Sequence, residues 1–281
     1  MSWHEDDRLA LAERVATEVA ARYGVAIEAP RLLHHSNNVV LLLTPEPIIA
    51  KVGMSRHRRS AAASLTRELE VGRFLADRHA PSARPASALP AGPHQARGVV
   101  VTFWDHCAHD PAREVEASAA GRSLAELHAA LAGYDDPLPP FTAQIDDAAR
   151  VLATEPMPAL APGDRAFLAD AHARQSAALS AHQLAAHPLH GEPHSGNVLA
   201  TPEGPCWIDF EAACLGPLEW DVACLGGEAL RHFPHLDHDL LGLMGRLRSL
   251  CVAVWCWMNP DRAPELREAA EHHLHRLRAD G

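Results

Sequence analysis

Two short segments carry the residues best suited to chemistry. Residues 190–197 read HGEPHSGN, which places the carboxylate of Glu192 five residues before the amide of Asn197. Asp209 follows twelve residues after Asn197, at the end of a short apolar run that is typical of a buried strand. Phosphoryl transfer needs a group that orients and deprotonates an attacking hydroxyl, together with oxygen ligands for Mg²⁺. We therefore expect Glu192 to act as the base, and Asn197 and Asp209 to hold the metal.

Lys51 is the only lysine in the chain, because every other strongly basic side chain is an arginine. It lies in the apolar run IIAKV at residues 48–52. In kinases a strand lysine of this kind contacts the nucleotide phosphates as a compact charge and pairs with a glutamate on a helix. Glu68 is the first candidate for that partner and Glu70 is the second. The alternative is an ordinary surface lysine at the end of a strand.

The pair of motifs HGEPHSGN and IDFE (208–211) resembles the aminoglycoside-phosphotransferase and choline-kinase-like family, whose pattern is H-G-D-x-x-x-x-N followed by I-D-[FW]-[DE]. The resemblance implies an α+β, bilobal protein-kinase-like fold with a small antiparallel-sheet N-lobe and a larger, mainly helical C-lobe. It also implies ATP or GTP with Mg²⁺ as cofactors. The γ-phosphate would pass to a hydroxyl of a small molecule such as an aminoglycoside, an amino-sugar or an amino-alcohol.

The chain departs from the family pattern at Glu192, where the family carries a catalytic Asp. The carboxylate is kept, so a general base is still available. Its extra methylene shifts the reach of the carboxylate, and a misplacement of about 1 Å can cost about 100-fold in rate. A second hypothesis is therefore a catalytically weakened pseudokinase that binds nucleotide as a regulatory or scaffold module.

The resemblance also suggests where the rest of the nucleotide lies. Ser36 and Asn37 occupy the turn where related kinases fold a loop over the phosphates, although this turn contains no glycine. Phe103 and Asp105 fall at the expected hinge, whose backbone pairs with a purine edge. A plain hairpin turn and a plain linker are the respective alternatives.

Three further polar side chains lie in or after the first motif. In the resembled family the acid at Asp221 anchors the catalytic loop, and His190 is expected to brace the same loop by hydrogen bonding. A third hypothesis is a metallohydrolase that uses His190 and His194, because a four-residue spacing suits one helical face. Gly191 and Pro193 make a helix implausible there.

Hydrophobic periodicity and turn residues predict the elements that position these side chains. We predict helices over residues 6–22, 64–78, 114–132, 164–179, 240–257 and 263–278, and strands over 39–43, 48–52 and 99–103. The turn at 44–47, TPEP, predicts that the first two strands form an antiparallel hairpin. We place an N-lobe at residues 1–103, covering the nucleotide, and a C-lobe at residues 104–281, with the catalytic loop, the metal site and the acceptor-binding helices.

Composition narrows the class of partner. The formal net charge of −11 argues against a nucleic-acid partner and mildly favours a cationic acceptor. The start of the chain lacks the basic and apolar pattern of a secretory signal, and no apolar run approaches the roughly 18 residues that span a bilayer. We therefore expect a cytoplasmic protein without a membrane partner, as a monomer or a homodimer. The six cysteines form no C-x-x-C pair, which indicates reduced thiols.

Overall fold

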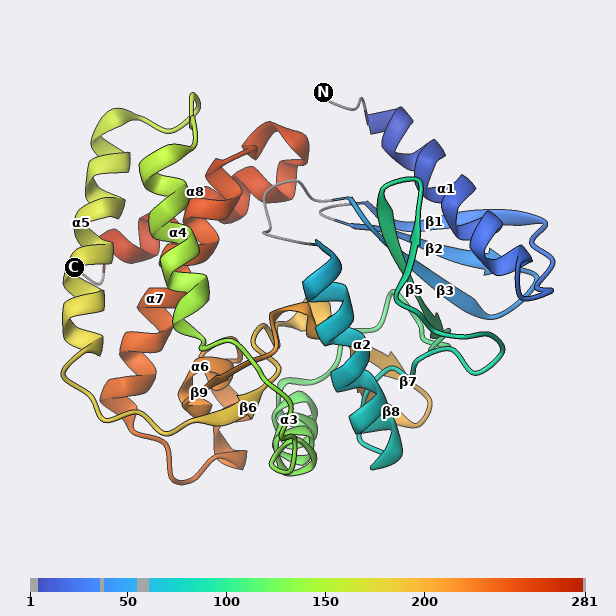
Figure 1. The fold of residues 1–281 in the computed structure, drawn as a ribbon. Coiled ribbons are helices and arrows are strands. Elements are labelled where there is room, and N and C mark those ends of the chain that lie inside the picture. Colours follow the sequence, from blue (N-terminus) through green and yellow to red (C-terminus); the bar gives the residue numbers. More distant parts are fainter. Residues whose placement is uncertain (1–4, 36–37, 55–60, 280–281) are drawn as a thin grey trace. The chain divides into compact units, whose positions relative to one another are not determined.

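The computed structural model describes residues 5–35, 38–54 and 61–279 (Figure 1). The chain divides into two compact units, each built from two stretches of sequence. Unit 1 comprises Met1–Asp136 and His194–Ala213, and unit 2 comprises Pro137–Pro193 and Cys214–Gly281. The predicted lobe boundary between residues 103 and 104 falls inside strand β5 (Val99–Asp105). Where the lobes of the kinase-like fold divide stays a prediction.

A five-stranded antiparallel sheet with strand order β1-β2-β3-β5-β4 forms the centre of unit 1 (Figure 1). Its other strands are β1 (Ala29–His35), β2 (Asn38–Thr44), β3 (Ile48–Gly53) and β4 (His94–Ala96). The β2 and β3 strands pair from Asn38 opposite Gly53 to Leu43 opposite Ile48. The antiparallel hairpin predicted from the sequence is therefore confirmed.

Helices α1 (Glu5–Ala21) and α2 (Ala61–Asp77) cover opposite faces of this sheet. In β5, Phe103 packs in the apolar cluster that contains Val15 of α1, whereas its neighbour Trp104 packs with Leu69 of α2. Successive side chains of a strand point to opposite faces, so one strand contributes to two separate apolar layers. Every second residue of β3 and β5 therefore faces α2.

The second stretch of unit 1 is a hairpin of β7 (Val198–Thr201) and β8 (Gly204–Trp207). Short 3-10 helices, η1 (Ser195–Asn197) and η2 (Phe210–Ala212), flank it. The fully buried Trp207 fixes the hairpin to the rest of the unit. Its indole Nε1 donates to Ser123 Oγ of α3 (Ala117–Leu131) at 3.1 Å, and its backbone oxygen accepts from the amide of Ala83 at 2.9 Å.

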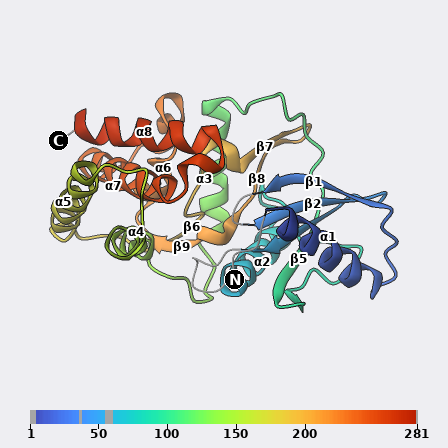
Figure 2. The same cartoon turned by 90° about the horizontal axis from the view of Figure 1, so that it is seen from above.

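Unit 2 is mainly helical and has one continuous apolar core. Figure 2 shows its helices α4 (Thr142–Thr154), α5 (Pro162–Leu179), α6 (Leu218–Val222), α7 (His238–Trp257) and α8 (Pro264–Ala279). A small antiparallel pair of strands, β6 (His187–Leu189) and β9 (Cys214–Gly216), completes it. By length and composition α7 could cross a membrane, but 72% of its most apolar window is buried among the other elements. This is the pattern of a helix at the centre of a core.

The predicted α+β class is confirmed, with an antiparallel sheet in the N-terminal region and helices in the C-terminal region. Each predicted helix and strand is present, with its ends within three residues of the predicted ones. The sequence analysis missed α4, although Ile145, Ala148 and Leu152 recur at helical spacing and are buried.

Candidate active site

Lys51 lies in the middle of β3, directly opposite Thr102 of β5. Because directly paired residues share a face, Lys51 points to the same side as Trp104, which is the side covered by α2. There its Nζ lies 2.9 Å from Oε1 and 3.0 Å from Oε2 of Glu68. Lys51 and Glu68 are only 7% and 3% exposed, so this ion pair is buried, whereas Glu70 is exposed. The structure thus pairs Lys51 with the first of the two predicted glutamates.

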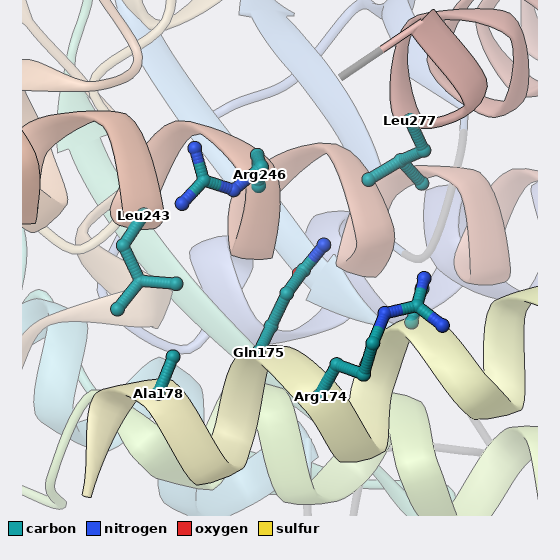
Figure 3. A pocket seen from close by; sticks show the side chains of 7 residues that line it. Arg174, Gln175, Ala178, Leu243, Arg246 and Leu277 are labelled. Atoms are coloured by element: carbon teal, nitrogen blue, oxygen red, sulfur yellow. The ribbon is translucent and has the colours of Figure 1, made fainter. Parts of the chain in front are cut away.

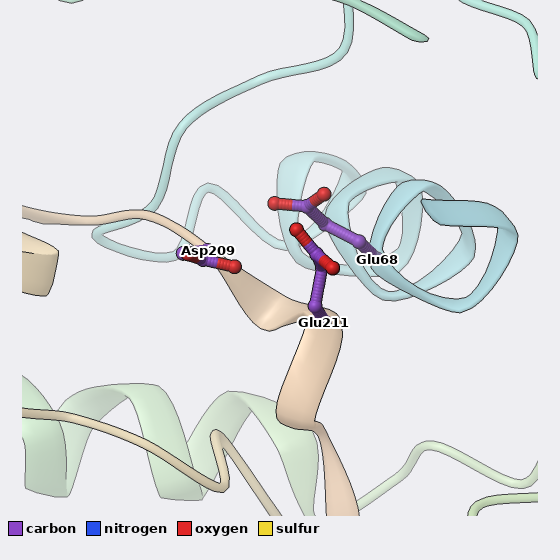
Figure 4. A group of neighbouring side chains, drawn as sticks. All are labelled: Glu68, Asp209 and Glu211. Carbon is purple, nitrogen blue, oxygen red and sulfur yellow. The ribbon is translucent and has the colours of Figure 1, made fainter. Parts of the chain in front are cut away.

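Two further carboxylates share the Lys51 ammonium. Asp209 Oδ1 lies 3.0 Å and Glu211 Oε1 lies 2.7 Å from Nζ. Figure 4 shows Glu68, Asp209 and Glu211 gathered together, and each offers an oxygen within 4.8 Å of the others. We call these three residues the acidic cluster. One ammonium faces three carboxylates, so negative charge is in excess.

The pKa values of Lys51 and Glu68 reflect that excess. Burial would lower the pKa of Lys51, but Asp209, Glu211 and Glu68 outweigh it and hold this pKa well above its ordinary value. Burial raises the pKa of Glu68 to about 8 despite the opposing effect of Lys51, and the other two acids raise it further. The two shifts look inconsistent for a single ion pair. They are consistent because Lys51 has three carboxylate partners, whereas Glu68 shares its single ammonium partner with Asp209 and Glu211.

This donor set fits a divalent cation. Carboxylate and amide oxygens are the ligands that Mg²⁺ prefers, and a buried excess of negative charge favours a bound cation. The 39% exposure of the Asp209 side chain leaves it open to solvent, while Glu68 and Glu211 are buried behind it. Asp209 is therefore the member of the acidic cluster that a solvent-borne ligand can reach.

The β7–β8 hairpin brings Asn197 and Asp209 to the same end. Asn197 directly precedes β7 and Asp209 comes two residues after β8, and Val198 pairs with Trp207 between them. The backbone amide of Ile208 also donates to the backbone oxygen of Asn197 at 3.0 Å. Asp209 has φ 66° and ψ 64°, in the left-handed region that non-glycine residues disfavour. Backbone strain of this kind is concentrated at functional sites.

Sequence analysis did not include Glu211 among the site residues. Its Oε1 accepts from Nδ2 of the buried Asn38 in β2, and its backbone oxygen accepts from Nε of Arg67 at 3.2 Å. Both contacts hold it against the sheet and α2. The sequence could have indicated Glu211 as a site residue, because it is the second acid of the IDFE motif.

Glu192 lies in unit 2, in the loop between β6 and the start of η1. The fully buried carboxylate of Asp221 holds this loop by accepting from the backbone amides of His190 and Gly191, both at 2.9 Å. His190 Nδ1 accepts from the backbone amide of Glu192 at 3.3 Å, and Arg248 of α7 donates to the backbone oxygen of Gly191. The anchoring role expected for Asp221 and the bracing role expected for His190 are both present.

The predicted hinge residues, Phe103 and Asp105, are held by contacts within unit 1. The backbone amide of Phe103 donates to Ala91 at 2.9 Å, and its backbone oxygen accepts from Ala86 at 3.0 Å. Asp105 Oδ1 accepts from the backbone amide of Ser87 at 3.0 Å and from its hydroxyl at 3.2 Å. These contacts occupy the backbone groups that a purine edge would need at Phe103, and thus do not favour pairing there. The roles of Phe103 and Asp105 in nucleotide binding stay predictions.

Two predictions remain to be compared with the structure: the phosphate contact of Ser36 and Asn37, and the metal-binding role of His190 and His194. Ser36 and Asn37 lie outside the described residues, so their contact with phosphate stays a prediction. Within the described part of the chain, the acidic cluster is the only group of three or more potential metal-binding acids, histidines or cysteines, and it contains no histidine. His194 Nδ1 instead accepts from the backbone amide of Gly196 at 3.0 Å, where it caps η1. His190 and His194 thus both accept hydrogen bonds from nearby backbone amides, which does not favour the metallohydrolase hypothesis.

A cavity of about 420 Å³ lies in unit 2 between α5, α7 and α8 (Figure 3). It is lined by Ala171, Arg174, Gln175, Ala178, Leu243, Arg246 and Leu277. None of these residues belongs to the predicted site. The cavity is therefore not part of the candidate active site.

A protein-kinase-like fold that pairs a strand lysine with a helix glutamate and an acidic cluster defines a class of phosphate-transferring proteins. The model of the phosphotransferase enzyme family matches residues 28–241. The chain belongs to this phosphotransferase family, and the resemblance seen in the sequence is confirmed. The pseudokinase alternative has no support from these comparisons.

Solved structures agree in fold. Amicoumacin kinase hAmiN, in complex with AMP-PNP, Ca²⁺ and Ami, is 14% identical, with a TM-score of 0.74 over 99% of this chain and 96% of that chain. Choline kinase LicA from Streptococcus pneumoniae is 13% identical, with a TM-score of 0.70 over 95% and 99%. A microcompartment-associated aminopropanol kinase is 16% identical, with a TM-score of 0.70 over 92% and 94%. The predicted protein-kinase-like fold is thereby confirmed. No curated protein sequence matches the chain.

Proposed function

We propose that the chain is a magnesium-dependent small-molecule kinase, which transfers the γ-phosphate of ATP or GTP to a hydroxyl of its acceptor. The observation that carries this proposal is the convergence of Lys51, Glu68 and Asp209, with Nζ at 2.9 and 3.0 Å from the two acids. Phosphoryl transfer depends on positioning and charge stabilisation more than on covalent chemistry of the protein. The buried ammonium of Lys51 and the more exposed carboxylate of Asp209 can together position the phosphates and stabilise their charge.

Each residue has a role in this proposal. Lys51 contacts the nucleotide phosphates, and Glu68 holds its side chain in place from α2. Asn197 and Asp209 would hold Mg²⁺, which supplies neutralisation of phosphate charge when it is bound. Glu211 contacts the ammonium of Lys51, and Asn38 of β2 in turn donates a hydrogen bond to Glu211.

Glu192 is the proposed base. Its carboxylate would accept the proton of the acceptor hydroxyl as the oxygen attacks the γ-phosphate. The backbone around it is fixed, because Asp221 holds the two preceding amides and Arg248 holds the oxygen of Gly191. A fixed backbone limits the positions that the longer glutamate side chain can take.

For the acceptor, we propose a cationic amino-alcohol, amino-sugar or aminoglycoside. The net charge of −11 supports a cationic ligand, because an acidic protein attracts cations. Several structural neighbours are named for acceptors of this kind, including choline and aminopropanol. A role in antibiotic resistance and a cytoplasmic location belong to the same proposal.

The test measures ADP or GDP release with Mg·ATP and Mg·GTP over a panel that contains choline, aminopropanol and kanamycin. Mass spectrometry then detects the phosphorylated acceptor. We expect acceptor-dependent release from the native chain and from the matched control Glu70→Gln, and loss of release in Asp209→Asn. Absence of Mg-dependent nucleotide binding by the native chain would contradict the proposal. So would nucleotide binding without a phosphorylated product from any acceptor, with turnover restored by Glu192→Asp.

A further inference from the structure

Two cysteines from distant parts of the sequence meet in unit 1. The Sγ atoms of Cys107 and Cys206 lie 3.5 Å apart. A disulfide requires the sulfurs to approach to about 2.05 Å, so they are already within about 1.5 Å of bonding distance. In the structure none of the six cysteines forms a disulfide.

The two cysteines differ in how freely they can move. Cys206 lies in β8, which is paired with β7 and ends at the buried Trp207. Cys107 lies two residues after β5, in a stretch without regular structure that leads to α3. Both are half-buried at the edge of the apolar cluster around Trp104. A rotation of the Cys107 side chain in its irregular segment can therefore close the remaining distance without disrupting the hairpin.

The environment also makes Cys107 the more reactive thiol. Its hydrogen bond with Cys206 lowers the pKa of Cys107 below its ordinary value, with a smaller contribution from Arg84. Burial instead raises the pKa of Cys224 to about 12 and that of Cys256 to about 11. Because the thiolate is the nucleophile, oxidation should begin at Cys107.

We propose that Cys107 and Cys206 are a redox-active dithiol, which a low-molecular-weight disulfide such as oxidised glutathione converts into an intramolecular disulfide. The Cys107 thiolate attacks one glutathione sulfur, the glutathione S–S bond breaks, and one glutathione thiolate leaves. Cys206 then gives up its proton and attacks the Cys107 sulfur, which releases the second glutathione. Two thiols lose two protons and two electrons, and oxidised glutathione gains both as two thiols.

The experiment reads the thiols rather than enzyme activity, so its outcome does not depend on the proposed function. The reduced full-length chain is incubated with oxidised glutathione, the free thiols are alkylated, and the peptides are mapped by mass spectrometry. We expect two of the six thiols to disappear, a cross-link between the Cys107 and Cys206 peptides, and reversal by dithiothreitol. Cys107 should also be alkylated about tenfold faster than Cys256 near pH 8.

Single variants separate the two steps. In Cys206→Ser the resolving thiol is absent, so glutathione should stay attached to Cys107. In Cys107→Ser no adduct or cross-link should form at Cys206, while the control Cys256→Ser should form the native cross-link. Circular dichroism checks that each variant is folded. Six free thiols in a folded, oxidised chain would overturn the proposal, as would a cross-link that maps to another pair.

Discussion

Lys51 lies closer to Glu211 than to the other two residues of the acidic cluster, with Nζ 2.7 Å from Oε1 of Glu211, compared with 2.9 Å to Glu68. The lysine is therefore held by a buried glutamate of α2 and a buried glutamate of η2, in addition to the more exposed Asp209. Three partners restrict the orientation of the amine more than a single ion pair would, because loss of one partner leaves the amine fewer fixed contacts.

The two glutamates can be tested one at a time. We expect Glu68→Gln and Glu211→Gln each to weaken Mg·nucleotide binding by about tenfold, or about 1.4 kcal/mol, because Lys51 loses one orienting carboxyl group. Without nucleotide, neither change should lower the thermal midpoint, since each glutamine still offers Lys51 an oxygen acceptor. Calorimetric titration and thermal unfolding measure the two effects. Glu70→Gln is the matched control on α2, and wild-type affinity in both test variants would refute the orienting role.

Because Asp209 has a left-handed backbone conformation, two substitutions at this position can distinguish its role as a metal ligand from its effect on stability. Asn tolerates this conformation better than Ala does, because its short polar side chain can bond to the local backbone. Asp209→Asn and Asp209→Ala should both lower kcat by at least about 100-fold through loss of the charged metal ligand. Asp209→Ala should in addition reduce the free energy of unfolding by about 1 kcal/mol relative to Asp209→Asn. Equal stability of the two variants in denaturant titrations would show that the backbone is not strained.

Glu192 should matter for turnover and not for nucleotide binding. Glu192→Gln removes a general base, and we expect kcat to fall by about 100-fold to 10,000-fold. The Kd for Mg·nucleotide should not change, because the phosphate-binding residues are intact. Steady-state kinetics and calorimetry check this split. The control is Glu203→Gln, an exposed acid in the turn between β7 and β8. Similar kcat values for the two variants would exclude Glu192 as the base.

Asp221 should be a structural requirement of the loop that carries Glu192. Its carboxylate accepts two backbone hydrogen bonds while fully buried. In Asp221→Asn, the side-chain NH2 group faces one of the two backbone N–H groups that the carboxylate accepted from, so one buried hydrogen bond is lost. We therefore expect the free energy of unfolding to fall by about 2–3 kcal/mol. The exposed Asp239→Asn should cost less than about 0.5 kcal/mol. Denaturant titration distinguishes them, and equal costs would mean that the loop is held by other contacts.

His273 gives the protein a pH dependence that is unrelated to the candidate active site. Burial, with smaller contributions from His272 and Arg276, lowers the pKa of His273 from 6.5 to about 4. Between these values the unfolded chain binds more protons than the folded one, so stability falls as the pH drops from 6.5 towards 4. The slope from this residue is at most about 1.4 kcal/mol per pH unit. His273→Gln should flatten the profile of unfolding free energy across that window, whereas the exposed His275→Gln should leave it unchanged. Superimposable profiles for His273→Gln and the native chain would contradict the assignment.

Most helices and strands could be predicted from the sequence, because hydrophobic periodicity and turn residues depend only on neighbouring positions in the chain. The strands at 39–43 and 48–52 are short, almost wholly apolar runs, and a turn with two prolines separates them. Helix α4 was missed although its apolar residues recur at helical spacing, because the segments on both sides of it are rich in proline. Strand β4 spans only three residues, too few to show a period.

The candidate site was only partly predictable from the sequence. The pairing of Lys51 with Glu68 instead of Glu70 follows from which side of α2 is buried, and a helical period could indicate that side. The contacts of Glu211 with Lys51 and Asn38 depend on how the β7–β8 hairpin meets the sheet. Contacts between segments far apart in the chain leave no trace in local spacing. The same limit applies to Cys107 and Cys206.

The single lysine also gives the chain only one site for a lysine-specific endoprotease, the bond between Lys51 and Val52. That bond lies in β3, which is hydrogen-bonded to β2 on one side and to β5 on the other. A protease cannot accept a strand that is paired on both edges, so the cut must wait until the sheet opens. The yield of two fragments over time therefore measures how often this sheet comes apart.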